Sequence, residues 1–165
     1  MLQLAVFFPV IAMFFIPFLR KNFKNIHTGK FVIIVPLILF GYFVSNIKYI
    51  YSGGTIYKKL AFVSNAGLDI NLNLDGLSLL FSLLITGIGT LVILYSCYYM
   101  SISDEKLHKF YIFLLIFMSA MLGVVLSDNM LSMYMFWELT SVSSFLLISY
   151  WHENDASRKG ALKSL

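Results

Sequence analysis

The sequence predicts an all-α transmembrane helix bundle of about five complete helices and the start of a sixth, with a short external hairpin between helices two and three. Three observations predict this fold class. Hydrophobic residues make up 59% of the chain and charged residues only 12%, whereas a soluble domain carries about 25% charged residues. The mean hydropathy is +0.84. The charged residues also leave five apolar runs, each of which approaches or exceeds the roughly 30 Å hydrocarbon core at helical rise.

Each apolar run is expected to be a helix, because lipid offers no hydrogen-bonding partner to an unpaired backbone. The first run has no basic residue before it and is followed by Arg20 and Lys21 rather than by a small-residue cleavage site. We therefore expect it to be a retained helix and not a signal peptide. The chain is expected to form a single membrane segment over residues 1–165, with helices at about 2–19, 31–47, 76–100, 110–127 and 130–151.

The segment before the third helix has a different pattern. Apolar residues alternate with polar ones from Leu68 to Leu74, and Asn65-Ala66-Gly67 supplies a turn before them. Alternation with period two is typical of a strand with one buried face. The segment is therefore expected to form an external hairpin or strand. Asp75 ends it, and the simplest role for Asp75 is the N-cap of the helix that begins at Gly76, with ion binding as the less favoured alternative.

Basic residues predict the orientation of the bundle. Nine of the twelve Lys and Arg fall on one side: four from Arg20 to Lys30, two in the loop after the third helix and three in the tail after residue 157. The positive-inside rule then places the N-terminus outside and the residue 165 end in the cytoplasm. Orientation and contact with anionic lipid of the bilayer account for the net charge of +4, so no nucleic acid partner is expected.

Motifs for soluble enzyme chemistry are absent from the sequence. It contains no phosphate-binding glycine loop after a strand, no Cys/His spacing for a metal and no nucleophile elbow. Cys97 is the single cysteine, so it cannot form an intramolecular disulfide, and it is most simply a small packing residue. We expect a protein that is not an enzyme, with no cofactor and no metal site.

The fifth run contains one carboxylate, Glu138, which lies eight residues after Met130. At helical rise this is about 12 Å into the hydrocarbon core, near its midplane. A charge at that depth costs roughly 2.5 to 3.5 kcal/mol on insertion scales and usually marks an ion or proton path. Desolvation favours the protonated carboxyl and a nearby Lys favours the charged form, so a carboxyl between these influences can exchange protons near neutral pH. Glu138 is thus the candidate protonatable transport residue.

Polar groups share the helical face of Glu138. At about 100° per residue, Tyr134, Ser141, Ser149 and His152 fall within about 60° of it. They are the possible path-lining residues, although His152 stands beside Glu153 at the cytoplasmic end and an interfacial, solvated role is favoured for it. Glu138 has a structural alternative, in which an ion pair or hydrogen bonds from its carboxylate only lock helices together.

Three stretches of the chain resemble a known family. "FWELTSVSSFLLISYW", the upstream "LNLDGLSLLFSLLITGIGTLVILYSCYYM" and "LSDNMLSMYMFWE" are similar to the N-terminal part of the large A subunit of the Mrp, or Mnh, multisubunit Na+/H+ antiporter. That protein is related to the antiporter-like proton-pumping subunits of complex I. The resemblance covers most of Leu72 to Leu165, and Ser149 stands where a Gly is expected.

The resemblance implies a multi-pass subunit of a hetero-oligomeric antiporter in the bacterial plasma membrane. Such a complex exchanges Na+ for H+ and serves pH homeostasis, its partners are the other antiporter subunits, and Glu138 maps onto the ionisable glutamate of the fifth helix. The A subunit of the family is several times longer and carries later lysines that pair with this glutamate. The 165 residues are therefore not expected to transport ions by themselves.

Two alternatives remain open. The chain could belong to a proton-pumping subunit of a complex I or a membrane hydrogenase, where redox chemistry elsewhere drives the same kind of path. It could also be a non-transporting structural or assembly membrane subunit, in which Glu138 acts only as the helix lock described above.

Overall fold

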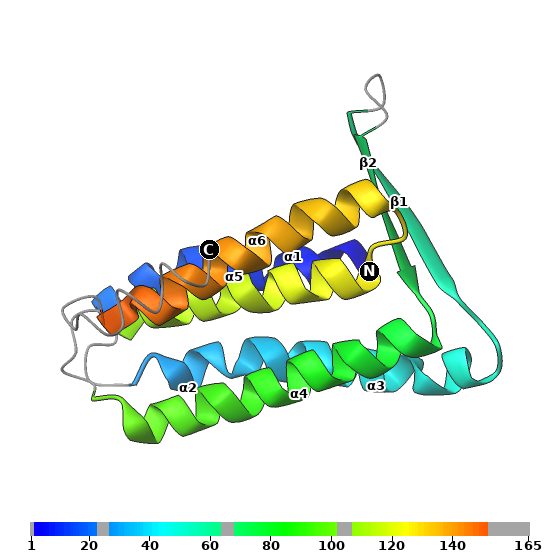
Figure 1. The fold of residues 1–165 in the computed structure, drawn as a ribbon. Helices are drawn as coiled ribbons and strands as arrows, with labels where there is room; N and C mark the ends of the chain where they lie inside the picture. Colours follow the sequence, from blue (N-terminus) through cyan, green and yellow to red (C-terminus); the bar gives the residue numbers. More distant parts are fainter. Residues whose placement is uncertain (1, 23–26, 64–67, 102–106, 152–165) are drawn as a thin grey trace.

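The structure, a computed structural model, describes residues 2–22, 27–63, 68–101 and 107–151. Within this part of the chain the long helices lie side by side in two layers, one formed by α1, α5 and α6 and the other by α2, α3 and α4 (Figure 1). The predicted fold class, a helical membrane bundle with a hairpin between the second and third predicted helices, is confirmed. The elements are α1 (Leu2–Asn22), α2 (Gly29–Val32), α3 (Ile34–Tyr51), β1 (Ile56–Val63), β2 (Leu68–Leu74), α4 (Gly76–Tyr99), α5 (Leu107–Leu126), α6 (Met130–Ile148) and η2 (Ser149–Trp151).

Four helical stretches of the described chain are long and apolar enough to cross a membrane: Gly29–Tyr51, Gly76–Tyr99, Leu107–Leu126 and Met130–Ile148. The apolar stretch Leu2–Phe18 of α1 is shorter than these four. The start of the expected sixth helix lies outside the described residues.

Several helices extend past the ends expected from their apolar runs. The α3 helix continues to Tyr51 and includes Lys48, while α5 starts at Leu107 and includes Lys109. A helix need not end where the hydrocarbon ends, because a long basic side chain in the first or last turn can reach the interface. The fifth helix is shorter than expected as a regular α-helix, since α6 ends at Ile148 and a 3-10 turn follows.

The second predicted helix contains a break near its start. Ile33 separates α2 from α3, and Pro36 lies in the first turn of α3. Proline has no N–H to donate to the carbonyl four residues earlier, so it fits a first turn without the loss of a helical hydrogen bond. The proline therefore favours a new helix start at this position rather than one uninterrupted helix.

The predicted hairpin is an antiparallel pair in which Ile56 lies opposite Leu74 and Leu60 lies opposite Ile70. The inward residues Ile70, Leu72 and Leu74 are buried, as the alternation predicts. The hairpin crosses the end of both helix layers (Figure 1). The turn expected at 65–67 lies outside the described residues.

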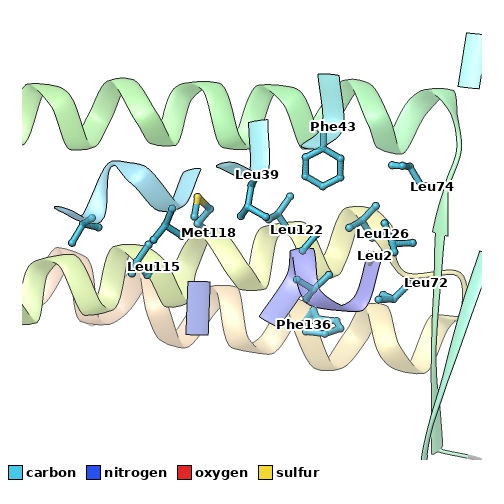
Figure 2. Packing of buried hydrophobic residues seen from close by; sticks show 14 of the residues in the cluster. Leu2, Leu39, Phe43, Leu72, Leu74, Leu115, Met118, Leu122, Leu126 and Phe136 are labelled. Carbon is cyan, nitrogen blue, oxygen red and sulfur yellow. The ribbon is translucent and has the colours of Figure 1, made fainter. Parts of the chain in front are cut away.

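The buried hydrophobic cluster fills the space between the two layers. Figure 2 shows Leu39 and Phe43 of α3 directed toward the side chains of α5, with Leu74 of β2 closing one end. Phe43 and Leu122 are fully buried. Because the cluster joins α1, α3, α5 and β2, burial of apolar surface holds both layers and the hairpin together.

The connections divide between the two ends of the bundle. The start of α1, the hairpin and the turn from α5 to α6 lie at one end, and the starts of α2 and α5 lie at the other (Figure 1). Lys30 and Lys109 belong to the second end, and Lys58 and Lys59 belong to the first. The fold thus places these lysines at opposite ends of the bundle, which is the arrangement that the predicted orientation requires.

Candidate functional site: a carboxylate within helix α6

The start of α6 is fixed to the hairpin. The Asn129 side chain accepts a hydrogen bond from the Ser132 backbone N–H at 2.6 Å and caps the helix. The Asn129 amide also donates to the Asp69 carbonyl of β2 at 2.6 Å, and the Ser132 hydroxyl reaches the same carbonyl at 3.3 Å. These bonds hold the start of α6 against the hairpin, and the later residues of the helix take their positions from that start.

One side of α6 packs closely against α5. Phe136 is buried, and its ring lies where a Cβ on Gly123 of α5 would stand. A small residue at a helix crossing lets two helices approach closely. Glu138 follows Phe136 by two residues, about 200° around the helix, and its side chain is exposed in the described chain. The carboxylate is therefore turned away from the contact with α5.

Tyr134 lies one turn before Glu138 on the same exposed side, and its hydroxyl lies near the Glu138 carboxylate. Residues four apart on a helix face each other in this way. A neutral hydroxyl leaves the charge of the carboxylate uncompensated. The pair lies near the middle of α6, eight residues after Met130 and ten before Ile148.

The other predicted path-lining residues are not brought to the carboxylate. Ser141 is half-buried. Ser149 lies in the 3-10 turn, where its hydroxyl donates to the Leu146 carbonyl at 3.1 Å, about 16 Å along the axis from Glu138 at helical rise. His152 lies outside the described residues. Of the four predicted neighbours, only Tyr134 is shown in contact with Glu138.

Charge compensation for Glu138 is missing from the part of the chain that the structure describes. There, the one ion pair joins Lys59 to Asp69 of the hairpin at 2.5 Å. In the same residues no group of three or more His, Cys, Asp or Glu is placed to hold a metal ion. The Glu138 carboxylate is therefore exposed at mid-helix, with the Tyr134 phenol beside it and no cation of the described residues in contact with it.

A second set of polar groups was not predicted from the sequence. His27, Ser96 and Tyr111 are buried and lie together where α2, α4 and α5 meet. Their separation in the sequence gives no local pattern that would predict the contact. An indirect signal was available, because a His next to Gly29 between two apolar helices needs partners for both ring nitrogens when it is buried.

Comparisons with known proteins agree with this architecture. Residues 61–111 match the family model "NADH-Ubiquinone oxidoreductase (complex I), chain 5 N-terminus", and residues 127–165 match "NADH:quinone oxidoreductase/Mrp antiporter, TM". The whole chain is 56% identical to the A1 subunit of a Na(+)/H(+) antiporter of Staphylococcus haemolyticus and 55% identical to that of Staphylococcus aureus. It spans about a fifth of the length of these curated relatives, 20% of each.

Two solved structures share the fold. A chain in the Mrp complex from Dietzia sp. DQ12-45-1b superposes with a TM-score of 0.80 at 23% identity, over 98% of this chain and 17% of that one. A chain of the membrane-bound sulfane sulfur reductase, an archaeal respiratory membrane complex, gives a TM-score of 0.81 at 22% identity, over 99% of this chain and 33% of that one.

The fold and the family matches together define a multi-pass α-helical membrane protein of the NADH:quinone oxidoreductase/Mrp antiporter class. Sequence identity to the staphylococcal proteins narrows the assignment from the family to one subunit. The chain belongs to the NADH:quinone oxidoreductase/Mrp antiporter family and corresponds to the N-terminal part of the Mrp A subunit. The predicted resemblance is confirmed.

Proposed function

We propose that this chain is the opening part of one of the subunits of a multisubunit Na+/H+ antiporter, and that Glu138 is its protonatable transport residue. The observation that carries the proposal is the place of Glu138, at mid-depth in α6 and on the side that does not pack against α5. Tyr134 contacts it, and no cation of the described chain does.

Lipid would make an uncovered Glu138 costly. If the exposed side of α6 faced hydrocarbon, charged Glu138 would cost roughly 2.5 to 3.5 kcal/mol, and Tyr134 would have to satisfy it alone. Cover by a further helix, with a cationic group or ordered water at the same depth, removes most of this cost. Since the curated relatives are about five times as long as this chain, we infer that the remainder of the polypeptide supplies the cover, including a lysine coupled to Glu138.

The proposed activity belongs to an assembled complex. The staphylococcal relatives are named as subunits of Na(+)/H(+) antiporters, and the Dietzia chain comes from an Mrp complex. By likeness to them, we propose other membrane subunits as partners, Na+ and H+ as the transported ions, and the bacterial plasma membrane as the location.

Replacing Glu138 by Gln in the complete complex tests the proposal. Glutamine keeps the size and the polarity of the side chain beside Tyr134 but cannot exchange a proton. We expect Na+-dependent proton exchange in membrane vesicles to fall to background while the complex is recovered in normal amount. The matched control is Asp128→Asn, which neutralises an exposed acid just before α6 and should leave exchange unchanged. Full exchange by the Glu138→Gln complex would remove the proposal.

The structural alternative predicts the opposite pair of results. If Glu138 only locks helices, Glu138→Gln should reduce recovery of the assembled complex, and Glu138→Asp should restore both recovery and exchange once the pair re-forms. Measuring assembly and exchange on the same preparation therefore separates a transport residue from a helix lock.

A redox-driven proton path is the second candidate, favoured by the fold shared with the archaeal respiratory complex and by the match to a complex I family model. Purification distinguishes the two. Iron-sulfur subunits that copurify with the chain would support the redox-driven complex, and small hydrophobic subunits alone would support the antiporter.

A further inference from the structure

The two glycines of the stretch "TGIGT" in α4 face different neighbours. A Cβ on Gly87 would stand 3.4 Å from the Phe40 ring of α3, which is an ordinary contact. A Cβ on Gly89 would stand 3.2 Å from the Met118 sulfur of α5, and a methionine side chain is flexible enough to move aside. Gly87 therefore belongs to the contact of α4 with α3, and Gly89 belongs to the contact of α4 with α5.

The contact of α4 with α5 contains an apolar groove of about 230 Å³. Its floor is formed by the buried side chains of Ile93, Leu115 and Met118, and its rim includes the exposed Ile88 and Val92. Figure 2 shows Leu115 and Met118 between the two helix layers. The lining that the structure describes has no charged or strongly polar side chain, since its other members are Leu84, Ile85, Gly89, Leu114, Phe117 and Met121.

The size of the groove fits a flexible apolar chain better than a helix. An α-helix with its side chains is about 10 Å wide, so one turn of 5.4 Å occupies roughly 420 Å³. An apolar cavity of about 150 Å³ is large enough to take up benzene, so a groove of about 230 Å³ has room for several methylene groups. An empty groove would leave the lining side chains without van der Waals partners on one side.

The rim of the groove also differs from the surfaces through which membrane helices meet. Those surfaces are enriched in small residues that allow close approach and in polar side chains that hydrogen-bond across the interface. The rim presents large apolar side chains instead. Leu84, Ile88 and Val92 of α4 are between 39% and 57% exposed, and Phe117 lines the α5 side. This composition favours contact with lipid over contact with another helix.

Two exposed tyrosines lie on the same side of α4 as the rim. At about 100° per residue, Tyr99 falls within about 20° of Ile88 and Val92, and Tyr95 falls within about 20° of Ile88. The Tyr95 and Tyr99 rings are stacked with centroids 5.6 Å apart, and the residues are 66% and 70% exposed. Such tyrosines are typical of the boundary between hydrocarbon and lipid headgroups, where the ring is in an apolar region and the hydroxyl is wet.

The depth of the groove matches the thickness of one lipid leaflet. Tyr99 follows Gly89 by ten residues, which is about 15 Å at helical rise. Half of the hydrocarbon core is also about 15 Å. An acyl chain whose headgroup lies at the level of the tyrosines therefore reaches Gly89 near the midplane of the bilayer.

We propose that the groove between α4 and α5 binds one acyl chain of a membrane phospholipid, whose headgroup lies beside Tyr95 and Tyr99. The chain fills the space that Gly89 leaves open beside Met118, and it completes the packing of the two helix layers at mid-depth. Under the orientation predicted from the basic residues, this lipid belongs to the cytoplasmic leaflet. The proposal rests on the groove and does not depend on the role of Glu138.

A photoactivatable phospholipid tests the proposal. The complete membrane complex is reconstituted in phospholipid vesicles that contain phosphatidylglycerol with a diazirine in the distal half of one acyl chain. After irradiation, mass spectrometry locates the labelled residues. We expect label on the floor residues Ile93, Leu115 or Met118 as well as on the exposed rim, because only a chain inside the groove reaches buried side chains.

Filling the groove should remove the label from its floor. In Gly89→Phe the added ring occupies the space beside Met118, so label on the floor should fall by at least about fivefold, because close packing leaves no room for the chain. Label on the exposed Ile88 should persist. The matched control is Gly41→Phe, since nothing lies within 4 Å of a Cβ on Gly41, and it should keep the wild-type pattern.

The wild-type complex decides the proposal even if Gly89→Phe assembles poorly. Label confined to the rim would show ordinary contact with the bilayer. Absence of label from rim and floor, with label on the exposed Leu37 and Ile38 of α3, would show that another part of the protein covers the groove. Either result overturns the proposal, and so does floor label that persists in an assembled Gly89→Phe complex.

Discussion

Asp75 and Ser78 close the start of α4 through reciprocal hydrogen bonds. The Ser78 N–H donates to the Asp75 carboxylate at 2.8 Å, and the Asp75 N–H donates to the Ser78 hydroxyl at 2.7 Å. This capping box satisfies two backbone donors at the end of the helix. The bond from the Ser78 N–H, followed by the bond with the Ser78 hydroxyl, holds the pKa of Asp75 below its usual range. The N-cap predicted for Asp75 is confirmed.

Replacing Asp75 by Ala should lower the stability of the complete polypeptide by about 1 kcal/mol, because the N-cap bond is lost. Asp75→Asn is the matched comparison, since Asn caps as well as Asp and carries no charge. Because the folded pKa is lowered, the ionic part of the stabilisation is present above the unfolded value of about 4 and is lost as the pH falls through the folded pKa.

Thermal unfolding in detergent between about pH 3 and pH 7 measures both effects. The wild type should lose more of its melting temperature on acidification than Asp75→Asn does. Equal acid dependence in the two proteins would show that the Asp75 charge is not stabilising.

At the scale of elements, the contact between α5 and α6 decides which side of α6 is buried and which side is left exposed. Phe136 packs over Gly123, and that contact turns Tyr134 and Glu138 outward. The hairpin fixes the start of the same helix through Asn129. Two contacts that do not involve the carboxylate itself therefore set its direction and its depth.

Adding a methyl group at Gly123 should loosen this contact. The Phe136 ring occupies the space, so Gly123→Ala is expected to destabilise the polypeptide by about 1 to 3 kcal/mol through overpacking. Gly41→Ala is the matched control, because nothing lies within 4 Å of a Cβ there and alanine has the higher helix propensity. Thermal unfolding in detergent compares the two.

A double variant checks the cause. Shrinking the ring with Phe136→Leu in the Gly123→Ala background should recover part of the lost stability. If Gly123→Ala is as stable as Gly41→Ala, the close crossing of α5 and α6 is not required.

Across the whole molecule, the distribution of basic residues between the two ends of the bundle predicts how the bundle is oriented in the membrane. The ends of the bundle differ in their connections (Figure 1), and Lys30 and Lys109 share one end. From the positive-inside rule we propose that this end lies in the cytoplasm. The hairpin, with its Lys59–Asp69 pair, would then lie outside. The Asp69 carboxylate raises the pKa of Lys59 by hydrogen bonding and by its charge, so this lysine stays charged at neutral pH.

Cysteine labelling of intact cells tests the orientation. In a Cys97→Ser background, Ser52→Cys, exposed beside the hairpin, should react with a membrane-impermeant maleimide. Lys30→Cys, exposed at the other end, should react only after the cells are permeabilised. The reverse pattern would show that the N-terminus lies inside.

Residue patterns predicted a large share of the fold. The apolar runs predict the helices because lipid leaves the backbone no other way to be satisfied, and the alternation up to Leu74 predicts β2 because its inward face is buried. The strand β1, "IYKKLAFV", was not predicted separately, since it shows no such alternation. Helix ends were misplaced by a few residues, because apolar runs report the thickness of hydrocarbon and not the end of hydrogen bonding.

The candidate site was likewise predictable from the sequence only in part. Sequence alone determined that Glu138 lies near the middle of a membrane helix, since depth follows from helical rise, and that Tyr134 lies on its side, since four residues make about one turn. Only the tertiary structure decided that this side faces away from α5, because that depends on how Phe136 meets Gly123. It also decided that His27 meets Tyr111, 84 residues away in the sequence. The periodicity of one helix determines the depth of a residue along that helix and the side of the helix on which it lies. Contacts between distant segments depend instead on how whole helices pack.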